Sequence, residues 1–151
     1  MNVFTDGACS NNGKVNAKAG YGIYIPPSKF SDAGSMEISR RVEGKQTNNT
    51  AELLAVINVF YILKTIINSG FLISIYSDSE YVIKCSCSYG KKSKDNNWKN
   101  KKGYIPNYKL VKEIYELFEK YKNVSIHYIQ AQHDTKKNDN ISLGNMIADK
   151  L

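Results

Sequence analysis

Four acidic side chains stand where carboxylates from different elements can meet. Asp6 and Asp78 each follow a short apolar stretch, as a residue at a strand end would. Glu52 lies in the first turn of an expected helix, and Asp149 lies on the last expected helix. Because strand ends beside a helix start can converge at one edge of an open sheet, these residues can form one carboxylate cluster.

Such a cluster suits hard divalent cations. Mg²⁺ and Mn²⁺ prefer carboxylate oxygens, keep part of their water and take phosphate oxygens as further ligands. Two such ions about 4 Å apart can activate a water and stabilise the leaving oxygen in phosphodiester hydrolysis. Taken singly, each acid also has an ordinary interpretation as a turn, helix-cap or surface residue. The residue types alone therefore leave both interpretations open.

Alternating and periodic apolar residues predict the elements that position these acids. Three strand candidates separated by turn residues favour an antiparallel meander at residues 3–6, 20–25 and 37–42. The remaining candidates are a helix at 50–67, a strand at 71–77, helices at 79–85 and 108–121, a strand at 124–129 and a final helix at 145–151. This order predicts a mixed sheet with helices on its faces.

The stretch 50–67 is the strongest helix candidate. Asn49 suits its N-cap, and Glu52 occupies the place of a capping-box acid. The stretch is apolar nearly all round, and its narrow polar stripe consists of Asn58, Tyr61, Thr65 and Asn68. We therefore expect this helix to be largely buried.

Length and charge narrow the class of protein. With 151 residues, 42% of them hydrophobic and 23% charged, the chain suits one folded domain over residues 1–151. Its net charge of +7 favours a polyanionic partner, most often nucleic acid. Arginine occurs only at Arg40 and Arg41, and lysine contacts phosphate as a point charge. We therefore expect the protein to bind the sugar–phosphate backbone of a nucleic acid without recognising particular bases.

Cysteine usage and hydropathy bear on the compartment. Cys9, Cys85 and Cys87 offer no disulfide framework, so we expect a reducing, intracellular compartment such as the cytoplasm or nucleus. Cys85 and Cys87 also lack a second ligand pair at zinc-site spacing. No apolar run reaches the roughly 20 residues of a membrane span. A strand candidate opens the chain, so neither a targeting segment nor a membrane partner is expected.

Lysine side chains concentrate between residues 89 and 104. The stretch 91–102 holds six lysines and one aspartate around Trp98, the only tryptophan. A solvated loop is the alternative interpretation, since most charge runs are solvated. An aromatic ring among lysines can instead pack against sugars while the lysines neutralise phosphates. We expect this segment to bind a nucleic-acid backbone through Trp98, Lys99, Lys101 and Lys102.

Three stretches resemble the signatures of the ribonuclease H family in order and spacing. They are Phe-Thr-Asp-Gly-Ala-Cys at 4–9, Thr-Asn-Asn-Thr-Ala-Glu-Leu at 47–53 and Ser-Asp-Ser-Glu-Tyr-Val at 77–82, with a closing Gly-Asn-x-x-Ala-Asp at 144–149. The resemblance covers essentially the whole chain. It implies an α/β fold, ribonuclease H-like, with a five-stranded mixed sheet whose first three strands are antiparallel and which is flanked by helices. Residues 89–104 resemble the basic protrusion of cellular-type members, which grips the DNA strand.

This resemblance implies an endoribonuclease that hydrolyses the RNA strand of an RNA–DNA hybrid. The implied cofactor is a pair of Mg²⁺ ions, for which Mn²⁺ can substitute, and the implied metal ligands are Asp6, Glu52, Asp78 and Asp149. His133 matches a loop histidine that assists proton transfer or product release, although an exposed loop histidine is the alternative. The 2′-hydroxyls mark the strand to be cut, because only RNA carries them. His127 alternates with apolar strand residues and is expected to be structural.

The resemblance also implies the residues that contact the hybrid. Asn48 and Asn49 would contact its minor groove, and Cys9 and Asn12 would lie beside the substrate. Thr47 and Lys45 would hold a DNA phosphate.

Two other functions stay open at this point. A DNA nuclease of the same broad fold is one, and the Thr-Asn-Asn stretch at 47–49 argues against it as a hybrid-binding signature. A catalytically silent nucleic-acid-binding module is the other. It has no need to gather four acids where phosphate binds. No obligate protein partner is expected, and a monomer is the simplest assembly.

Overall fold

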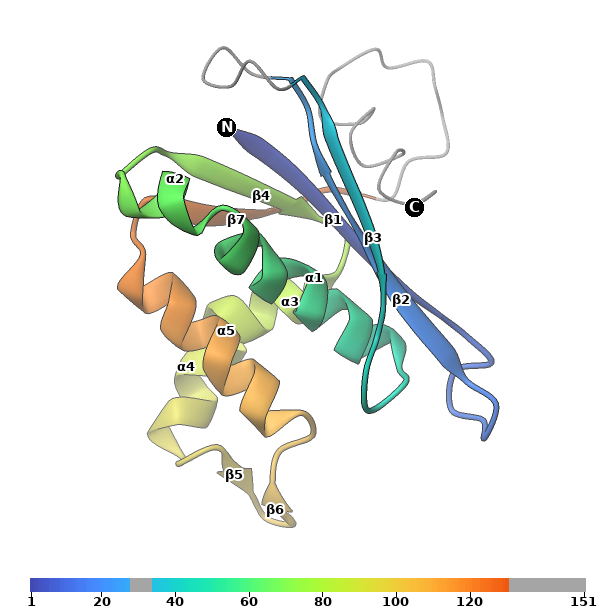
Figure 1. Cartoon of the computed structure of the whole chain (residues 1–151). Helices are drawn as coiled ribbons and strands as arrows, with labels where there is room; N and C mark the ends of the chain where they lie inside the picture. Colours follow the sequence, from blue (N-terminus) through green and yellow to red (C-terminus); the bar gives the residue numbers. More distant parts are fainter. Residues whose placement is uncertain (28–33, 131–151) are drawn as a thin grey trace.

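A five-stranded mixed sheet forms the centre of the molecule, in the order β3-β2-β1-β4-β7 (Figure 1). The computed structural model describes residues 1–27 and 34–130. β1 pairs antiparallel with β2 and β2 with β3, whereas β4 runs parallel to both β1 and β7. The strands are β1 (Asn2–Ser10), β2 (Lys18–Ile25), β3 (Met36–Arg41), β4 (Ile73–Ser77) and β7 (Val124–Tyr128). The expected α/β fold, with its first three strands antiparallel, is confirmed.

The helices follow the expected order with two differences, a division of the first helix and an additional helix, α4, that was not expected. They are α1 (Asn48–Ile62), α2 (Lys64–Asn68), α3 (Glu80–Ser86), α4 (Ser88–Asp95) and α5 (Tyr108–Lys120), and a small hairpin of β5 (Lys99–Asn100) and β6 (Gly103–Tyr104) lies between α4 and α5. The stretch 50–67, expected as one helix, is divided at Leu63, which ends α1 and precedes α2. None of the helices within the described residues combines the length and apolar character needed to cross a membrane.

Helix α1 packs against one face of the sheet, over β1 and β2 (Figure 1). Its side chains at Ala51, Leu53 and Val56 are fully buried, and so are Val3 and Ile23 of the strands below them. Tyr61 of the expected polar stripe is 57% exposed. The nearly all-round apolar sequence of α1 thus matches its central place in the core, as expected.

The N-terminus of α1 begins two residues earlier than the sequence suggested. Thr47 has an extended backbone and is the N-cap, and its Oγ1 accepts a hydrogen bond of 3.0 Å from the amide of Thr50. The expectation that Asn49 caps the helix is therefore wrong, because Asn49 is already inside the first turn. Threonine and asparagine are both good caps, so residue type alone does not select between them.

Helices α3, α4 and α5 pack on one another beside α1, and α3 also contacts β4 and β7. Gly90 of α4 is buried at their junction, where an added Cβ would lie 2.0 Å from the carbonyl oxygen of Cys85 and 2.6 Å from a ring carbon of Tyr115. Only glycine allows the backbone of α4 to approach α3 this closely. This packing fixes the base from which the β5–β6 hairpin projects (Figure 1).

Candidate active site

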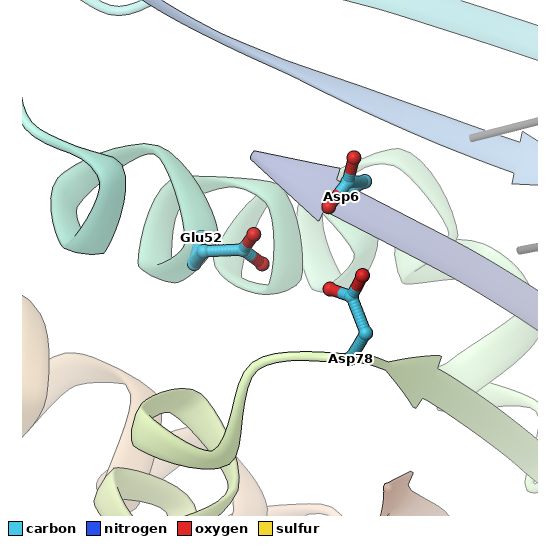
Figure 2. A group of neighbouring side chains, drawn as sticks. All are labelled: Asp6, Glu52 and Asp78. Carbon is cyan, nitrogen blue, oxygen red and sulfur yellow. The ribbon is translucent and has the colours of Figure 1, made fainter. Parts of the chain in front are cut away.

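Three of the four expected acids meet in the structure. Asp6, Glu52 and Asp78 each offer a carboxylate oxygen, and these oxygens all lie within 4.8 Å of one another. Figure 2 shows the three side chains pointing toward a common space, from β1, from α1 and from the end of β4. The sequence-based expectation that these acids form one cluster is confirmed for these three residues.

Strand pairing explains why the two aspartates meet. β1 and β4 are parallel neighbours, and Thr5 pairs with Ser77 at the last step of their ladder. Asp6 is the next residue of β1 and Asp78 is the first residue after β4, so the two acids lie side by side. β4 ends there, whereas β1 continues to Ser10 beside β2. The cluster therefore lies where two adjacent parallel strands separate.

Glu52 reaches the cluster because α1 approaches β1 unusually closely. An added Cβ at Gly7 would lie 2.5 Å from the amide nitrogen of Glu52 and 2.6 Å from the carbonyl carbon of Ala51. Real Cβ atoms do not tolerate such distances to backbone atoms, so glycine is required at this position. The amide of Gly7 also donates a hydrogen bond of 2.9 Å to Oε1 of Glu52, whose side chain is only 7% exposed.

The three carboxylates repel one another when all are ionised. Two unit charges about 5 Å apart cost roughly 3 kcal/mol at an effective dielectric constant of about 20. A divalent cation relieves this repulsion, and carboxylate oxygens are the donors that Mg²⁺ and Mn²⁺ prefer. The donor set and its spacing therefore fit a hard divalent metal ion.

Several expected substrate contacts gather next to the cluster. Oδ1 of Asn12 accepts a hydrogen bond of 3.2 Å from the amide of Asn48, and Sγ of Cys9 lies 3.5 Å from the carbonyl oxygen of Gln46. These contacts bring the β1–β2 hairpin against the segment 45–49. The exposed or half-buried side chains of this surface are Cys9, Asn12, Lys45, Thr47, Asn48 and Asn49.

Gln46 is a positioning residue that the sequence did not reveal. Its Oε1 accepts a hydrogen bond of 2.6 Å from the amide of Ala19, and its Nε2 donates to the carbonyl oxygens of Val42 and Gly44. The side chain thereby ties the segment before α1 to β2. A glutamine between a glycine turn and a helix gives no local signal of such a role.

Trp98 occupies a different place from the one expected. It is only 9% exposed, belongs to the main hydrophobic core and lies 6.2 Å from Tyr115 between ring centroids. The expectation of a surface platform at Trp98 is corrected, because a ring buried this far offers little area to a sugar. Its packing instead holds the hairpin on the helical layer.

Tyr104 is the exposed aromatic ring of this segment, at 56% exposure. Its ring stacks on Tyr108 with centroids 4.2 Å apart, and Nζ of Lys99 lies 4.9 Å from the Tyr104 centroid. Lys101 and Lys102 are exposed in the turn between β5 and β6. The hairpin thus presents three lysines beside a stacked pair of tyrosines.

One of the two histidines, His127, lies in the part of the chain that the structure describes. His127 lies on β7, where its ring stacks on Tyr76 at 5.2 Å and its Nε2 lies 2.9 Å from Oγ of Ser125. These contacts agree with the structural role expected of it. His133 and Asp149, the remaining expected catalytic residues, lie outside the described residues.

Comparison with known proteins assigns the family. The RNase H family model matches residues 1–151. Ribonuclease H of Orientia tsutsugamushi is 30% identical over 155 aligned residues, which cover 100% of this chain and 79% of that protein.

Solved structures of low sequence identity share the fold. The PFV RNase H domain has a TM-score of 0.75 and 24% identity, with 99% of this chain and 89% of that chain covered. LC11-RNase H1, solved in complex with an RNA/DNA hybrid, has a TM-score of 0.60 and 21% identity, with 99% and 96% covered. The family model matches the whole chain, and a relative is 30% identical over the whole chain. The chain therefore belongs to the ribonuclease H family, and its enzyme class is ribonuclease H.

Proposed function

We propose that this protein hydrolyses the RNA strand of RNA–DNA hybrids with divalent metal ions held by Asp6, Glu52, Asp78 and Asp149. The observation that carries the proposal is the meeting of three carboxylates within 4.8 Å, from β1, α1 and the end of β4. Membership of the ribonuclease H family gives the reaction class. A bound hybrid of LC11-RNase H1, which shares the fold, supports the substrate class.

The metal-binding residues have distinct supports in the fold. A pair of Mg²⁺ ions, replaceable by Mn²⁺, would supply an activated water and stabilise the leaving oxygen. Asp6 and Asp78 are held by adjacent parallel strands. Glu52 is oriented by the Gly7 amide, which fixes Oε1 on the side of β1. Asp149 completes the proposed ligand set, and His133 is proposed to assist proton transfer or product release.

The proposed hybrid contacts are in register with the carboxylates. Asn48 precedes Glu52 by four residues, about one helical turn, so both side chains lie on the same side of α1. A base pair in contact with Asn48 and Asn12 would therefore lie close to the metal ligands. We propose that Asn48, Asn49, Asn12 and Cys9 contact the minor groove, and that Thr47 and Lys45 hold a DNA phosphate.

The β5–β6 hairpin is proposed to grip the DNA strand. Lys99, Lys101 and Lys102 are exposed there and can neutralise phosphates, while Trp98 supports the hairpin from within. Residues 1–151 would act as one catalytic domain, with residues 89–104 as its basic protrusion. All the proposed ligands come from one chain, so a monomer suffices. The free thiols of Cys9, Cys85 and Cys87 fit a reducing compartment such as the cytoplasm or nucleus.

A comparison of three labelled duplexes tests the proposed function. RNA–DNA hybrid, duplex RNA and duplex DNA are each incubated with Mg²⁺, with Mn²⁺ and with a chelator. We expect metal-dependent cutting of the RNA strand in the hybrid alone. Cutting of duplex DNA would instead support a DNA nuclease, and hybrid binding without cutting would support a silent binding module. Either result contradicts the proposal.

A further inference from the structure

A groove of about 490 Å³ lies on the part of the sheet formed by β1, β2 and β3, beginning at Asp6. Asp6, Ala8 and Ser10 alternate along β1 and share one face of the sheet. Gly7, between them, faces α1 on the other side. The groove therefore opens on the face opposite α1 and continues directly from the carboxylate cluster.

Small residues make the floor of this groove. Across the strands, Asp6 pairs with Gly22 and Ala8 pairs with Gly20. Gly20 in turn pairs with Arg41 on β3. With glycine or alanine at three neighbouring positions, these strand residues leave the space above them without a large side chain from the floor itself. Within residues 1–27 and 34–130, the groove thus has room for a ligand that lies along β1.

The walls of the groove are basic. Lys18, which pairs with Ser10, lines it at the end far from Asp6, and Arg40 and Arg41 line it from β3. Arg41 pairs with Gly20, the partner of Ala8, so its side chain lies on the same face as the groove floor. Neither of the two arginines nor Lys18 forms an ion pair with a carboxylate of the described residues. A guanidinium group matches phosphate oxygens in a two-pronged hydrogen-bonded geometry.

The length of the groove fits a continuing nucleic-acid strand. From Asp6 to Ser10 is four residues of strand, or about 13 Å. A duplex rises about 3.4 Å for each nucleotide of a strand, so this distance corresponds to about four nucleotides. A strand whose scissile phosphate lies at the carboxylates could therefore place later phosphates beside Arg41 and Lys18.

We propose that this basic groove binds backbone phosphates of the cut strand, up to about four nucleotides away from the scissile phosphate. The proposal rests on the proposed hydrolysis of hybrids and extends it by a binding site on the opposite side of β1 from α1. Arg41 and Lys18 supply the charge, and the glycine floor admits the backbone. The carboxylate of Asp6 marks the end where the metal ions bind.

Hybrids of two lengths test this groove. A short hybrid ends close to the cut, and an extended hybrid continues past it by more than about four nucleotides, on one side or the other. Binding is measured by fluorescence anisotropy over a range of salt, in an Asp78→Asn background that keeps the substrate intact. The double variant Lys18→Gln/Arg41→Gln removes the two charges. The control Lys112→Gln/Lys120→Gln removes two exposed charges on α5, away from the groove.

The groove variant should lose affinity only for the extended hybrid. The slope of log affinity against log salt should fall by about 1.8, because each phosphate contact contributes about 0.9 on a duplex. The control variant should not weaken the binding of one hybrid more than the binding of the other. If the groove variant lost the same affinity for both hybrids, or lost none, the proposed phosphate binding in the groove would be wrong. The proposed function would still stand if the parent enzyme cuts hybrids. A parent enzyme that neither binds nor cuts hybrids would overturn both.

Unfolding and charge-retaining variants separate binding from folding. Thermal unfolding of each variant should match that of its parent, since Lys18 and Arg41 are exposed. Arg41→Lys keeps the charge and should retain most of the salt dependence. If Arg41→Lys lost as much of it as Arg41→Gln, the phosphate-binding assignment would be wrong.

Discussion

The backbone amide of Gly7 donates a hydrogen bond of 2.9 Å to Oε1 of Glu52, and this contact joins β1 to the helix that supplies the second carboxylate. The two residues are 45 positions apart in the chain. Their contact is possible only because Gly7 has no Cβ, which would otherwise lie 2.5 Å from the Glu52 amide nitrogen. The geometry of the carboxylate cluster therefore depends on a close approach of strand and helix.

Replacing Gly7 by alanine should damage both stability and activity. The added methyl meets backbone atoms of Ala51 and Glu52, which cannot rotate away, so α1 must shift from β1. We expect the free energy of unfolding to fall by about 1–3 kcal/mol, as for other overpacked sites. Cleavage should fall further than stability explains, because Glu52 is displaced. Denaturant unfolding and single-turnover cleavage measure the two effects. Asn2→Ala, at the exposed start of β1, should change neither appreciably.

Divalent metal should stabilise the protein through the carboxylate cluster. A ligand at about one hundred times its dissociation constant adds about 2.7 kcal/mol to the folded state. Melting curves with Mg²⁺, Mn²⁺ or chelator should show this shift for the parent protein. Glu52→Gln keeps an oxygen for the Gly7 amide but removes one charge, so its metal-free form should be at least as stable. Its metal-induced shift should be much smaller, whereas Glu116→Gln on α5 should keep the full shift.

If metal raised the melting temperature of Glu52→Gln as much as that of the parent, the metal would bind elsewhere than at Asp6, Glu52 and Asp78. A metal-free form of that variant much less stable than the parent would also be informative. It would mean that the Glu52 charge stabilises the fold, against the repulsion expected among three carboxylates within 4.8 Å.

Trp98 and Tyr104 should separate stability from substrate binding. Trp98→Ala removes a buried ring from the core, so the free energy of unfolding should fall by about 3–5 kcal/mol. Tyr104→Ala removes an exposed ring and should cost little stability while weakening hybrid binding. Unfolding curves and hybrid titrations of the two variants check this. A stable Trp98→Ala protein with lost hybrid binding would restore Trp98 as a surface contact.

Cys85 should make stability depend on alkaline pH. Burial raises the pKa of the Cys85 thiol to about 12, from a usual value of 9.0. Between about pH 9 and about pH 12 the folded protein keeps this proton and the unfolded chain releases it. The free energy of unfolding should therefore fall as pH rises through this window. Tyr81, whose pKa burial also raises, contributes in the same direction.

Two cysteine variants isolate the thiol from Tyr81. Cys87→Ala keeps Cys85 and should retain the parent's alkaline loss of stability. Cys85→Ala should show a shallower loss over the same window, since Tyr81 is present in both proteins. Reagent labelling gives a second check, because exposed Cys87 should react readily and buried Cys85 only on unfolding. Equal pH slopes in the two variants would contradict the burial of a protonated Cys85.

The acids could be predicted because local patterns place them near strand ends and a helix start, and because the resemblance to ribonuclease H signatures decided between the two interpretations. Short apolar stretches mark the two strands before Asp6 and Asp78, and parallel pairing places these acids together. The expectation that the first strand ends at Asp6 is wrong, because β1 continues to Ser10 beside β2. Glu52 could be assigned to a helix start by the same kind of pattern. The hydrogen bond that orients it could not, because it depends on how closely two distant segments approach.

Trp98 and Gln46 were misjudged for the same physical reason, which is contact between distant segments. Trp98 lies among lysines in the sequence, but α5 brings Tyr115 against it and buries it. Gln46 looks like a loop residue, but β2 offers it the amide of Ala19. The N-cap was misplaced for a local reason, since threonine and asparagine both serve as N-caps and only the backbone geometry selects Thr47.

Single-turnover cleavage of an RNA–DNA hybrid by the parent protein and by Asp78→Asn, with Mg²⁺ present, tests the central claim most directly. Asparagine keeps the shape of the side chain but removes a charge from the cluster at the end of β4. We expect the parent to cut the RNA strand, and Asp78→Asn to bind the hybrid and unfold like the parent while cutting it at least about a hundredfold more slowly, the loss typical of removing one electrostatic contribution. Cleavage by Asp78→Asn at the parent's rate would contradict the assignment of Asp6, Glu52 and Asp78 as the catalytic metal site.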